Sequence, residues 1–343
     1  MARSEPAPGL FGFLHFHDWR WGEKGPEGVE LRSEWIGDGT EWNEAVVSWN
    51  VEPATGAVLE VDAQEDTVLA EGDWRRLGTW SLGEGSPGER TSLRGQQGEW
   101  GAVKTDTLVL ARPATRIRIR LRMRGELASH PERLRWLTVS LVDTRREPVE
   151  REPLKAAWGQ TLDVPERSQV SFAEGRAWCS PTSVSMVLGW WARTLGRAEL
   201  DRPVPEVAAG VYDPGWSGTG NWPFNMAYAG SVGGLRACAV RLRDLRDVET
   251  MVAAGVPVVL SVNAPALRGK PVAPDGGHLV TVVGFTQTGD PVVNDPWARL
   301  EEGQRVRRVY PRANVVRAWA HAHRLAYWVV PEDRIDLFPG RHL

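Results

Sequence analysis

The stretch Ala177–Leu195, AWCSPTSVSMVLGWWARTL, contains the pattern that decides the fold of the second half of the chain. Apolar side chains recur in it at intervals of three and four residues, which is the period of an amphipathic helix. They are Val184, Val187, Leu188, Trp191 and Leu195. Ser180 is expected to cap the first turn, and Pro181 fits the first helical position. Cys179 is therefore expected at the N-terminus of this helix.

The position of Cys179 bears on its chemistry. Unpaired backbone N–H groups and the helix dipole stabilise a thiolate at a helix N-terminus and lower its pKa. The same N–H groups suit an oxyanion. On position alone a second interpretation stays open, because a free cysteine often serves as a small buried apolar side chain.

Two further candidates come from a predicted hairpin later in the chain. His278 begins the apolar run HLVTVVGFT directly after two glycines, and Asp295 ends the next run, PVVND. The intervening TQTGD is typical of a hairpin turn, so the end of the second strand is expected beside the start of the first. The carboxylate would then fix the tautomer of the imidazole and stabilise its charged form. The alternatives are a histidine at an exposed strand end and a simple Asn-Asp-Pro turn.

The composition is that of a soluble globular protein, with 42% hydrophobic and 25% charged residues over 343 positions, enough for two domains. A net charge of −3 gives no reason to expect a nucleic-acid partner or an anionic membrane. The sequence has neither the ~18–20 apolar residues of a membrane span nor a visible signal peptide. The compartment stays open between cytoplasm and export. Cys179 and Cys238 are too few for a disulfide framework or a four-cysteine zinc site, although a single bridge between them stays open.

Two domains are expected, with a boundary near residue 150. Residues 1–150 contain short strand-like runs separated by turn residues, which favours an all-β sandwich. Within them RIRIRLRMRG, residues 116–125, alternates arginine with apolar side chains, as a half-buried strand does. The charged run 144–160 carries two prolines and is expected to be a linker. In residues 151–343 helical runs precede strand-like runs, which favours an α+β domain over a doubly wound sheet.

Three motifs, SQVSFAEGRAWCSPTSVSMVLGWW, GGHLVTVVGF and VNDPW, together resemble a known family. This family comprises the papain-like cysteine peptidases related to the double-glycine leader peptidases of bacteriocin exporters, and the match is closest to its stand-alone, soluble bacterial members. The resemblance covers roughly residues 160–332. It implies a papain-like cysteine peptidase domain of the α+β class at 151–343, preceded by the β-sandwich accessory domain at 1–150.

The resemblance also implies a role for each matched residue. Cys179 corresponds to the nucleophile, His278 to the general base and Asp295 to the residue that orients the imidazole. Gln169 best matches the glutamine that precedes the cysteine and helps form the oxyanion hole, whereas Gln160 lies further upstream and matches less well. The implied reaction is hydrolysis of a peptide or protein substrate through a thioester, with no metal or organic cofactor.

The chain also departs from the exporters. It lacks a Walker-type glycine loop and a membrane span, so leader cleavage coupled to transport is not expected, and Ser180 stands where glycine is common. The same three residues would equally serve an amidase acting on the stem peptides of peptidoglycan. A papain-like domain that binds a peptide without cleaving it is the third hypothesis.

Nine of the 18 tryptophans precede residue 150. Aromatic platforms on a β-sandwich can stack on sugars, so glycan or cell-wall binding is one hypothesis for the N-terminal domain. Packing within the core is the favoured alternative. In the second domain the glycine- and aromatic-rich stretch 215–230 is expected to be a loop, and lining the substrate site is one hypothesis for it. Trp178 and Trp297 flank the candidate residues and would exclude water from them. Packing in the core is an equal alternative for the aromatic residues of this stretch and for both flanking tryptophans.

Overall fold

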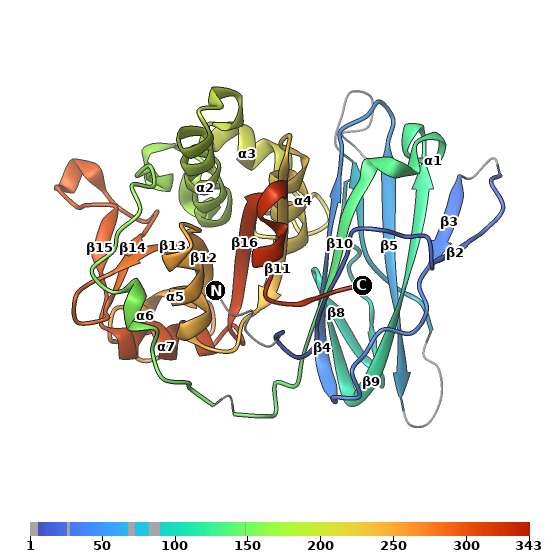
Figure 1. Ribbon diagram of the computed structural model, residues 1–343, viewed down its shortest axis with the longest axis horizontal. Coiled ribbons are helices and arrows are strands. Elements are labelled where there is room, and N and C mark those ends of the chain that lie inside the picture. Colours follow the sequence, from blue (N-terminus) through green and yellow to red (C-terminus); the bar gives the residue numbers. More distant parts are fainter. Residues whose placement is uncertain (1–5, 26–27, 68–72, 82–89, 148) are drawn as a thin grey trace. The chain divides into compact units, whose positions relative to one another are not determined.

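The structure is a computed structural model and describes residues 6–25, 28–67, 73–81, 90–147 and 149–343. The chain divides into two compact units, whose elements are labelled in Figure 1. The first unit comprises residues 1–146, 212–231 and 338–343, and the second comprises residues 147–211 and 232–337. The predicted domains, 1–150 and 151–343, stay a prediction, and the units differ from them in that residues 212–231 and 338–343 group with the first unit.

Strands dominate the first unit, as the α+β class with a strand-rich N-terminal region predicts. The strands are β1 (Leu10–Phe13), β2 (Arg20–Trp21), β3 (Val29–Arg32), β4 (Trp42–Val51), β5 (Val58–Thr67), β6 (Arg75–Ser81), β7 (Gln97–Gly98), β8 (Gly101–Lys104), β9 (Thr107–Arg124), β10 (Leu134–Val142) and β17 (Arg341–His342). Its helices are α1 (Glu126–Ser129) and α4 (Trp222–Ser231), and Pro131–Arg133 forms a 3-10 turn.

Hydrogen bonds join these strands, within the described residues, into one 11-stranded sheet with the main order β17-β1-β10-β4-β9-β3-β2. The long strand β9 makes this continuity possible. It pairs with β8 over residues 107–110 and with β5 over residues 114–124. The two stacked sheets of a sandwich stay a prediction.

The alternation in β9 is present as the sequence predicts. Its apolar side chains, Ile117, Ile119, Leu121 and Met123, are fully buried. The arginines lie on the other face, where β5 supplies acidic partners. Asp62 pairs in register with Arg120 and accepts its Nη2 hydrogen bond at 2.9 Å. Cross-strand pairs of opposite charge of this kind stabilise a sheet.

Helix α4 corrects the predicted loop at 215–230. Asn221 accepts the backbone N–H of Phe224 at 3.1 Å, which satisfies a donor in the first turn of the helix. The ring of Phe224 then packs against Trp80 at 5.3 Å and Trp49 at 6.2 Å between centroids. Burial of three aromatic rings outweighs the weak helix propensity of a glycine-rich segment.

The second unit mixes helices and strands. Its helices are α2 (Cys179–Leu195), α3 (Val204–Val211), α5 (Leu245–Ala253), α6 (Ala264–Leu267) and α7 (Arg312–Ala320). Its strands are β11 (Leu235–Arg241), β12 (Val258–Asn263), β13 (Gly277–Phe285), β14 (Pro291–Asn294), β15 (Arg307–Val309) and β16 (Leu325–Pro331). Short 3-10 turns occupy Lys155–Ala157, Gln169–Ser171, Gly175–Ala177, Ala198–Leu200, Leu300–Glu302 and Glu332–Leu337.

The six strands of this unit form one sheet in the order β11-β16-β12-β13-β14-β15. Neighbouring strands run antiparallel throughout. Helix α2 precedes this sheet in the chain and contacts β13 and β16. The predicted α+β class is therefore confirmed.

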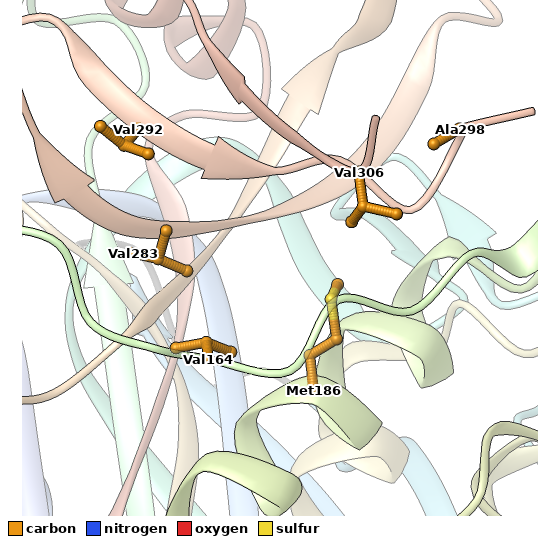
Figure 2. Packing of buried hydrophobic residues seen from close by; sticks show 6 residues of the cluster. All are labelled: Val164, Met186, Val283, Val292, Ala298 and Val306. Carbon is orange, nitrogen blue, oxygen red and sulfur yellow. The ribbon is translucent and has the colours of Figure 1, made fainter. Parts of the chain in front are cut away.

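An apolar cluster fixes α2 against β13 and the strands that follow it (Figure 2). Its members are Val164, Met186, Val283, Val292, Ala298 and Val306. Met186 comes from α2 and Val283 from β13, and both are fully buried. Removing this much apolar surface from water holds the start of the helix in a fixed place beside the sheet.

The segment 144–160, expected to be a linker, is anchored for most of its length to the second unit. Arg151 donates to Asp244 and Asp247 at 2.6 Å each, and the buried Glu249 accepts from the indole of Trp158 at 2.9 Å. At its last residue, the carbonyl of Gln160 accepts the backbone N–H of Phe285 at 2.9 Å.

Candidate active site

Cys179 is the first residue of α2, as the sequence predicts. The predicted capping role of Ser180 is wrong, because Trp178 is the cap residue and makes no side-chain capping bond. Ser180 instead points into the protein, where its hydroxyl lies 2.8 Å from the hydroxyl of Tyr327 on β16. This bond joins two residues that are 147 positions apart in the chain, and it connects the first turn of α2 to the sheet. The thiol of Cys179 is half-buried.

The hairpin of β13 and β14 brings His278 and Asp295 together, as predicted from its turn. His278 is the second residue of β13, and Asp295 follows directly after β14. The two strands are antiparallel, with Thr281 opposite Asn294. The Nε2 atom of His278 lies 2.8 Å from Oδ1 of Asp295, and both side chains are buried.

Asp295 is fully buried and accepts several hydrogen bonds. Besides His278, the backbone N–H of Trp297 donates to Oδ1 at 2.9 Å, and the hydroxyl of Tyr310 donates to Oδ2 at 2.7 Å. Burial alone would raise the pKa of this carboxyl, but these donors hold the pKa well below its usual range. Asp295 is therefore ionised at neutral pH.

Tyr310 was not among the site residues predicted from the sequence. Burial and the neighbouring charge of Asp295 raise the pKa of its phenol to about 12, so it stays a donor at any ordinary pH. Two guanidinium groups also approach Oδ2 of the same carboxylate. Nη2 of Arg268 lies at 3.7 Å and Nη1 of Arg308 at 3.8 Å.

His278 also hydrogen-bonds the thiol of Cys179. Because Nε2 is bonded to Asp295, the nitrogen that faces the sulfur is Nδ1. Burial would lower the pKa of the imidazole, but the bonds and charges of Asp295 and Cys179 raise it to about 9. The ring is therefore largely protonated at neutral pH.

The pKa of the Cys179 thiol is shifted in the opposite direction to that of His278, since it is lowered. Burial would raise the pKa of Cys179, but the hydrogen bond and charge of His278 bring it below its usual value. The backbone N–H groups of Leu279 and Ser180 add to this effect. A thiolate beside an imidazolium is the nucleophilic form of such a pair.

Gln169 lies in the short turn that precedes α2 and is buried. Its Nε2 atom donates to the carbonyls of Gly175 and Arg176 at 2.8 and 3.0 Å. A side-chain amide has two N–H hydrogens, so both are engaged in holding the turn that leads into Cys179. Gln160, the weaker candidate, is exposed and donates to the carbonyl of Ala156 at 2.7 Å.

Two protein-family models match parts of this chain. Residues 161–327 match the model of the peptidase C39-like family. Residues 27–140 match the peptidase C39 N-terminal domain. The chain is therefore similar to the C39-like peptidase family over residues 161–327 and to the N-terminal domain of such peptidases over residues 27–140. The family supports an activity of the cysteine-peptidase type. The matched range contains Cys179, His278 and Asp295.

A protein from Bacillus anthracis described as a C39-like peptidase shares 17% identity and covers 53% of this chain and 98% of its own, with a TM-score of 0.38. No protein among the curated sequences matches the chain. Within the described residues, no helix is both long and apolar enough to cross a membrane.

The tryptophans that flank the site in the C39-like domain are both half-buried. Trp297 donates its backbone N–H to Asp295, and the ring of Trp178 packs on Phe172 at 5.8 Å between centroids. Cys179 and Cys238 are not joined by a disulfide, so the bridge left open by the sequence is not formed. Among the described residues, no three His, Cys, Asp or Glu side chains gather into a metal-binding group.

Most tryptophans of the N-terminal unit are packed. Trp19, Trp42, Trp49, Trp80 and Trp136 are buried. Three others are half-buried under guanidinium groups, with Arg118 on Trp35 at 4.2 Å, Arg120 on Trp74 at 4.4 Å and Arg75 on Trp100 at 4.2 Å from the ring centroids. Because cations cover these faces, they offer little surface to a sugar, and glycan binding is not supported.

Proposed function

We propose that this C39-like protein is a cysteine peptidase that hydrolyses peptide bonds through a thioester on Cys179. The observation that carries the proposal is the placement of His278. One nitrogen of its ring is bonded to the buried carboxylate of Asp295, and the ring also bonds the thiol at the start of α2. This is the arrangement of nucleophile, base and orienting group that acyl transfer requires.

In the proposed reaction the thiolate of Cys179 attacks the carbonyl carbon of the substrate. The imidazolium of His278 then gives its Nδ1 proton to the leaving amine, and the C–N bond breaks to leave a thioester. Neutral His278 next takes a proton from water, whose oxygen attacks the thioester. Collapse of that intermediate releases the acid and restores the thiolate and the imidazolium. Asp295 stays ionised throughout and holds the ring in one orientation.

The negative oxygen formed in both attacks needs donors. The first backbone N–H groups of α2 lack partners within the helix, and they point towards its N-terminal end, where the sulfur lies. A contribution from Gln169 is part of the family-based proposal. It requires one N–H of this side chain to leave the carbonyl of Gly175 or Arg176.

The experiment is a cleavage screen of a peptide library, read by mass spectrometry, with two matched variants. Cys179→Ala is expected to abolish cleavage, whereas Cys238→Ala is expected to retain it, because Cys238 is a fully buried residue of β11. Persistent cleavage by Cys179→Ala would disprove the mechanism.

The same screen tests the two alternatives. Cleavage confined to peptidoglycan stem peptides would indicate the amidase. A binding protein without activity would leave every peptide intact, and iodoacetamide would label Cys179 of the native protein no faster than an ordinary thiol. Faster labelling of Cys179 at neutral pH is the result expected of an enzyme.

A further inference from the structure

We propose that Arg268 and Arg308 form an anion-binding subsite beside His278 that takes a carboxylate in the leaving part of the substrate. The inference rests on the proposed peptidase function and deepens it by naming a class of substrate. The two arginines come from different places in the chain, since Arg268 follows α6 and Arg308 lies in β15. Both reach the same carboxylate oxygen, Oδ2 of Asp295.

The distances from Asp295 show that neither guanidinium group is hydrogen-bonded to its carboxylate. At 3.7 and 3.8 Å both nitrogens lie beyond hydrogen-bond length from Oδ2, whose close donor is Tyr310 at 2.7 Å. The other bonds of Arg308 go to neutral oxygens, the carbonyls of Arg305 and Trp297 and the side chain of Gln304. Within the described residues, Asp295 is thus the ion-pair partner of both guanidinium groups, and neither is hydrogen-bonded to a carboxylate.

Five charged groups of the described residues meet here in the reactive form of the site. The thiolate of Cys179 and the carboxylate of Asp295 face three cations, His278 and the two arginines. Among these five groups one positive charge is in excess. The side chains of Arg268 and Arg308 are 36% and 25% exposed, so they can meet a ligand from solvent, whereas Asp295 has no exposed surface.

The chemistry of the reaction says which part of the substrate lies there. The leaving amine receives its proton from His278, so the residues that follow the scissile bond extend on the His278 side of Cys179. Both arginines approach Asp295, which holds the ring of His278, so we infer that they lie on that same side, within reach of a few residues of extended chain. A carboxylate at that point would accept the fork of donors that a guanidinium presents.

Two anions fit this chemistry, the α-carboxylate of a short leaving peptide and the side chain of an acidic residue. The first experiment tests the shared charge without a known substrate. It compares the rates at which iodoacetate, an anion, and iodoacetamide, its neutral isostere, alkylate Cys179. Arg268→Gln and Arg308→Gln are each expected to lower the iodoacetate-to-iodoacetamide ratio about two- to fourfold at low ionic strength.

Three controls make the comparison specific. Arg193→Gln removes an equal charge from the last turn of α2, about 21 Å along the helix from Cys179, and is expected to leave the ratio unchanged. Arg268→Lys and Arg308→Lys keep the charge and are expected to keep most of the ratio. Salt at 1 M is expected to remove the difference between the wild-type protein and the glutamine variants.

The outcomes separate this inference from the function on which it rests. Rapid alkylation of Cys179 with an iodoacetate-to-iodoacetamide ratio that neither arginine substitution changes would overturn the subsite. The proposed peptidase function would then still stand. Equal slowing of both reagents would also overturn it, since the arginines would then act only through Asp295. Slow alkylation of the wild-type protein by both reagents would instead refute the proposed function.

A second experiment distinguishes the two sources of the carboxylate. The dipeptides Ala-Ala, Ala-Ala amide and Ala-Glu amide are compared as protectants of Cys179 against iodoacetamide. Stronger protection by Ala-Ala would assign the subsite to an α-carboxylate, and stronger protection by Ala-Glu amide to an acidic side chain. Equal protection by all three, or protection by none, would count against the inference.

Discussion

Replacing Asp295 by asparagine tests whether its charge makes Cys179 reactive. The asparagine oxygen can keep the Oδ1 contacts with His278 and the N–H of Trp297, and its amide would face the hydroxyl of Tyr310, which can accept as well as donate. The substitution therefore removes a charge and alters little of the packing.

The size of the expected effect on Cys179 follows from the pKa shift of the His278 imidazole. Raising the pKa of His278 from 6.5 to about 9 corresponds to about 3 kcal/mol, since each tenfold change in acidity is worth about 1.4 kcal/mol. Burial opposes this shift, and Asp295 is the foremost of the groups that produce it. Loss of its charge is expected to lower the pKa of His278 towards its ordinary value and to decrease the thiolate fraction at pH 7 at least about tenfold.

The assay is the rate of iodoacetamide alkylation of Cys179 between pH 5 and 10. The wild-type protein is expected to react at a nearly constant rate up to about pH 9, because the ion pair persists until the imidazolium loses its proton. In Asp295→Asn the rise in rate is expected at higher pH, with convergence of the two curves in alkali. Superimposable curves would refute the reasoning, since the carboxylate would then contribute nothing to the thiolate.

Other contacts predict further results. Tyr310→Phe removes a donor to a buried carboxylate and is expected to cost about 1.5–3 kcal/mol of unfolding free energy in urea; no change would contradict the bond. Gly284→Ala would place a Cβ 2.3 Å from the carbonyl of Gln160, so we expect a loss of about 1–3 kcal/mol. Gly233→Ala, which meets only the end of an arginine side chain at 3.7 Å, is the matched control and is expected to change stability much less. The folded state holds the pKa of Asp295 below its ordinary 3.8, so its charge stabilises the fold above that pH and ceases to do so as the pH falls through the folded pKa. The difference in unfolding free energy between wild type and Asp295→Asn is therefore expected to shrink below about pH 4, and a constant difference would contradict it.

Local sequence patterns predicted the frame of the site. The start of α2 follows from apolar spacing, and the proximity of His278 to Asp295 follows from a hairpin whose turn is only five residues long. Both inferences need only contacts between segments that adjoin in the sequence or are joined by a short turn. The alternating β9 was predictable for the same reason, because period two requires one apolar face.

Contacts between segments that are distant in the chain were not predicted from the sequence. Ser180 resembles a cap, but the hydroxyl of Tyr327, 147 residues away, is its actual partner. The approach of Arg268, Arg308 and Tyr310 to one carboxylate depends on how three segments fold around β14, and none of these residues stands in a recognisable motif. Helix α4 was missed because glycines at its upstream side suggest a loop, whereas the packing of Phe224 decides the outcome.

The interleaving of the two units has an evolutionary consequence. The chain leaves the unit that bears Cys179 after Val211, contributes α4 to the strand-rich unit and returns at Val232. A recombination event that inherited residues 1–146 alone would acquire a sheet without the helix that packs on its tryptophans. One that inherited residues 147–337 would carry that helix without Trp49 and Trp80, on which it packs. The two halves are therefore expected to be transmitted through gene lineages as one indivisible module and not shuffled as separate cassettes.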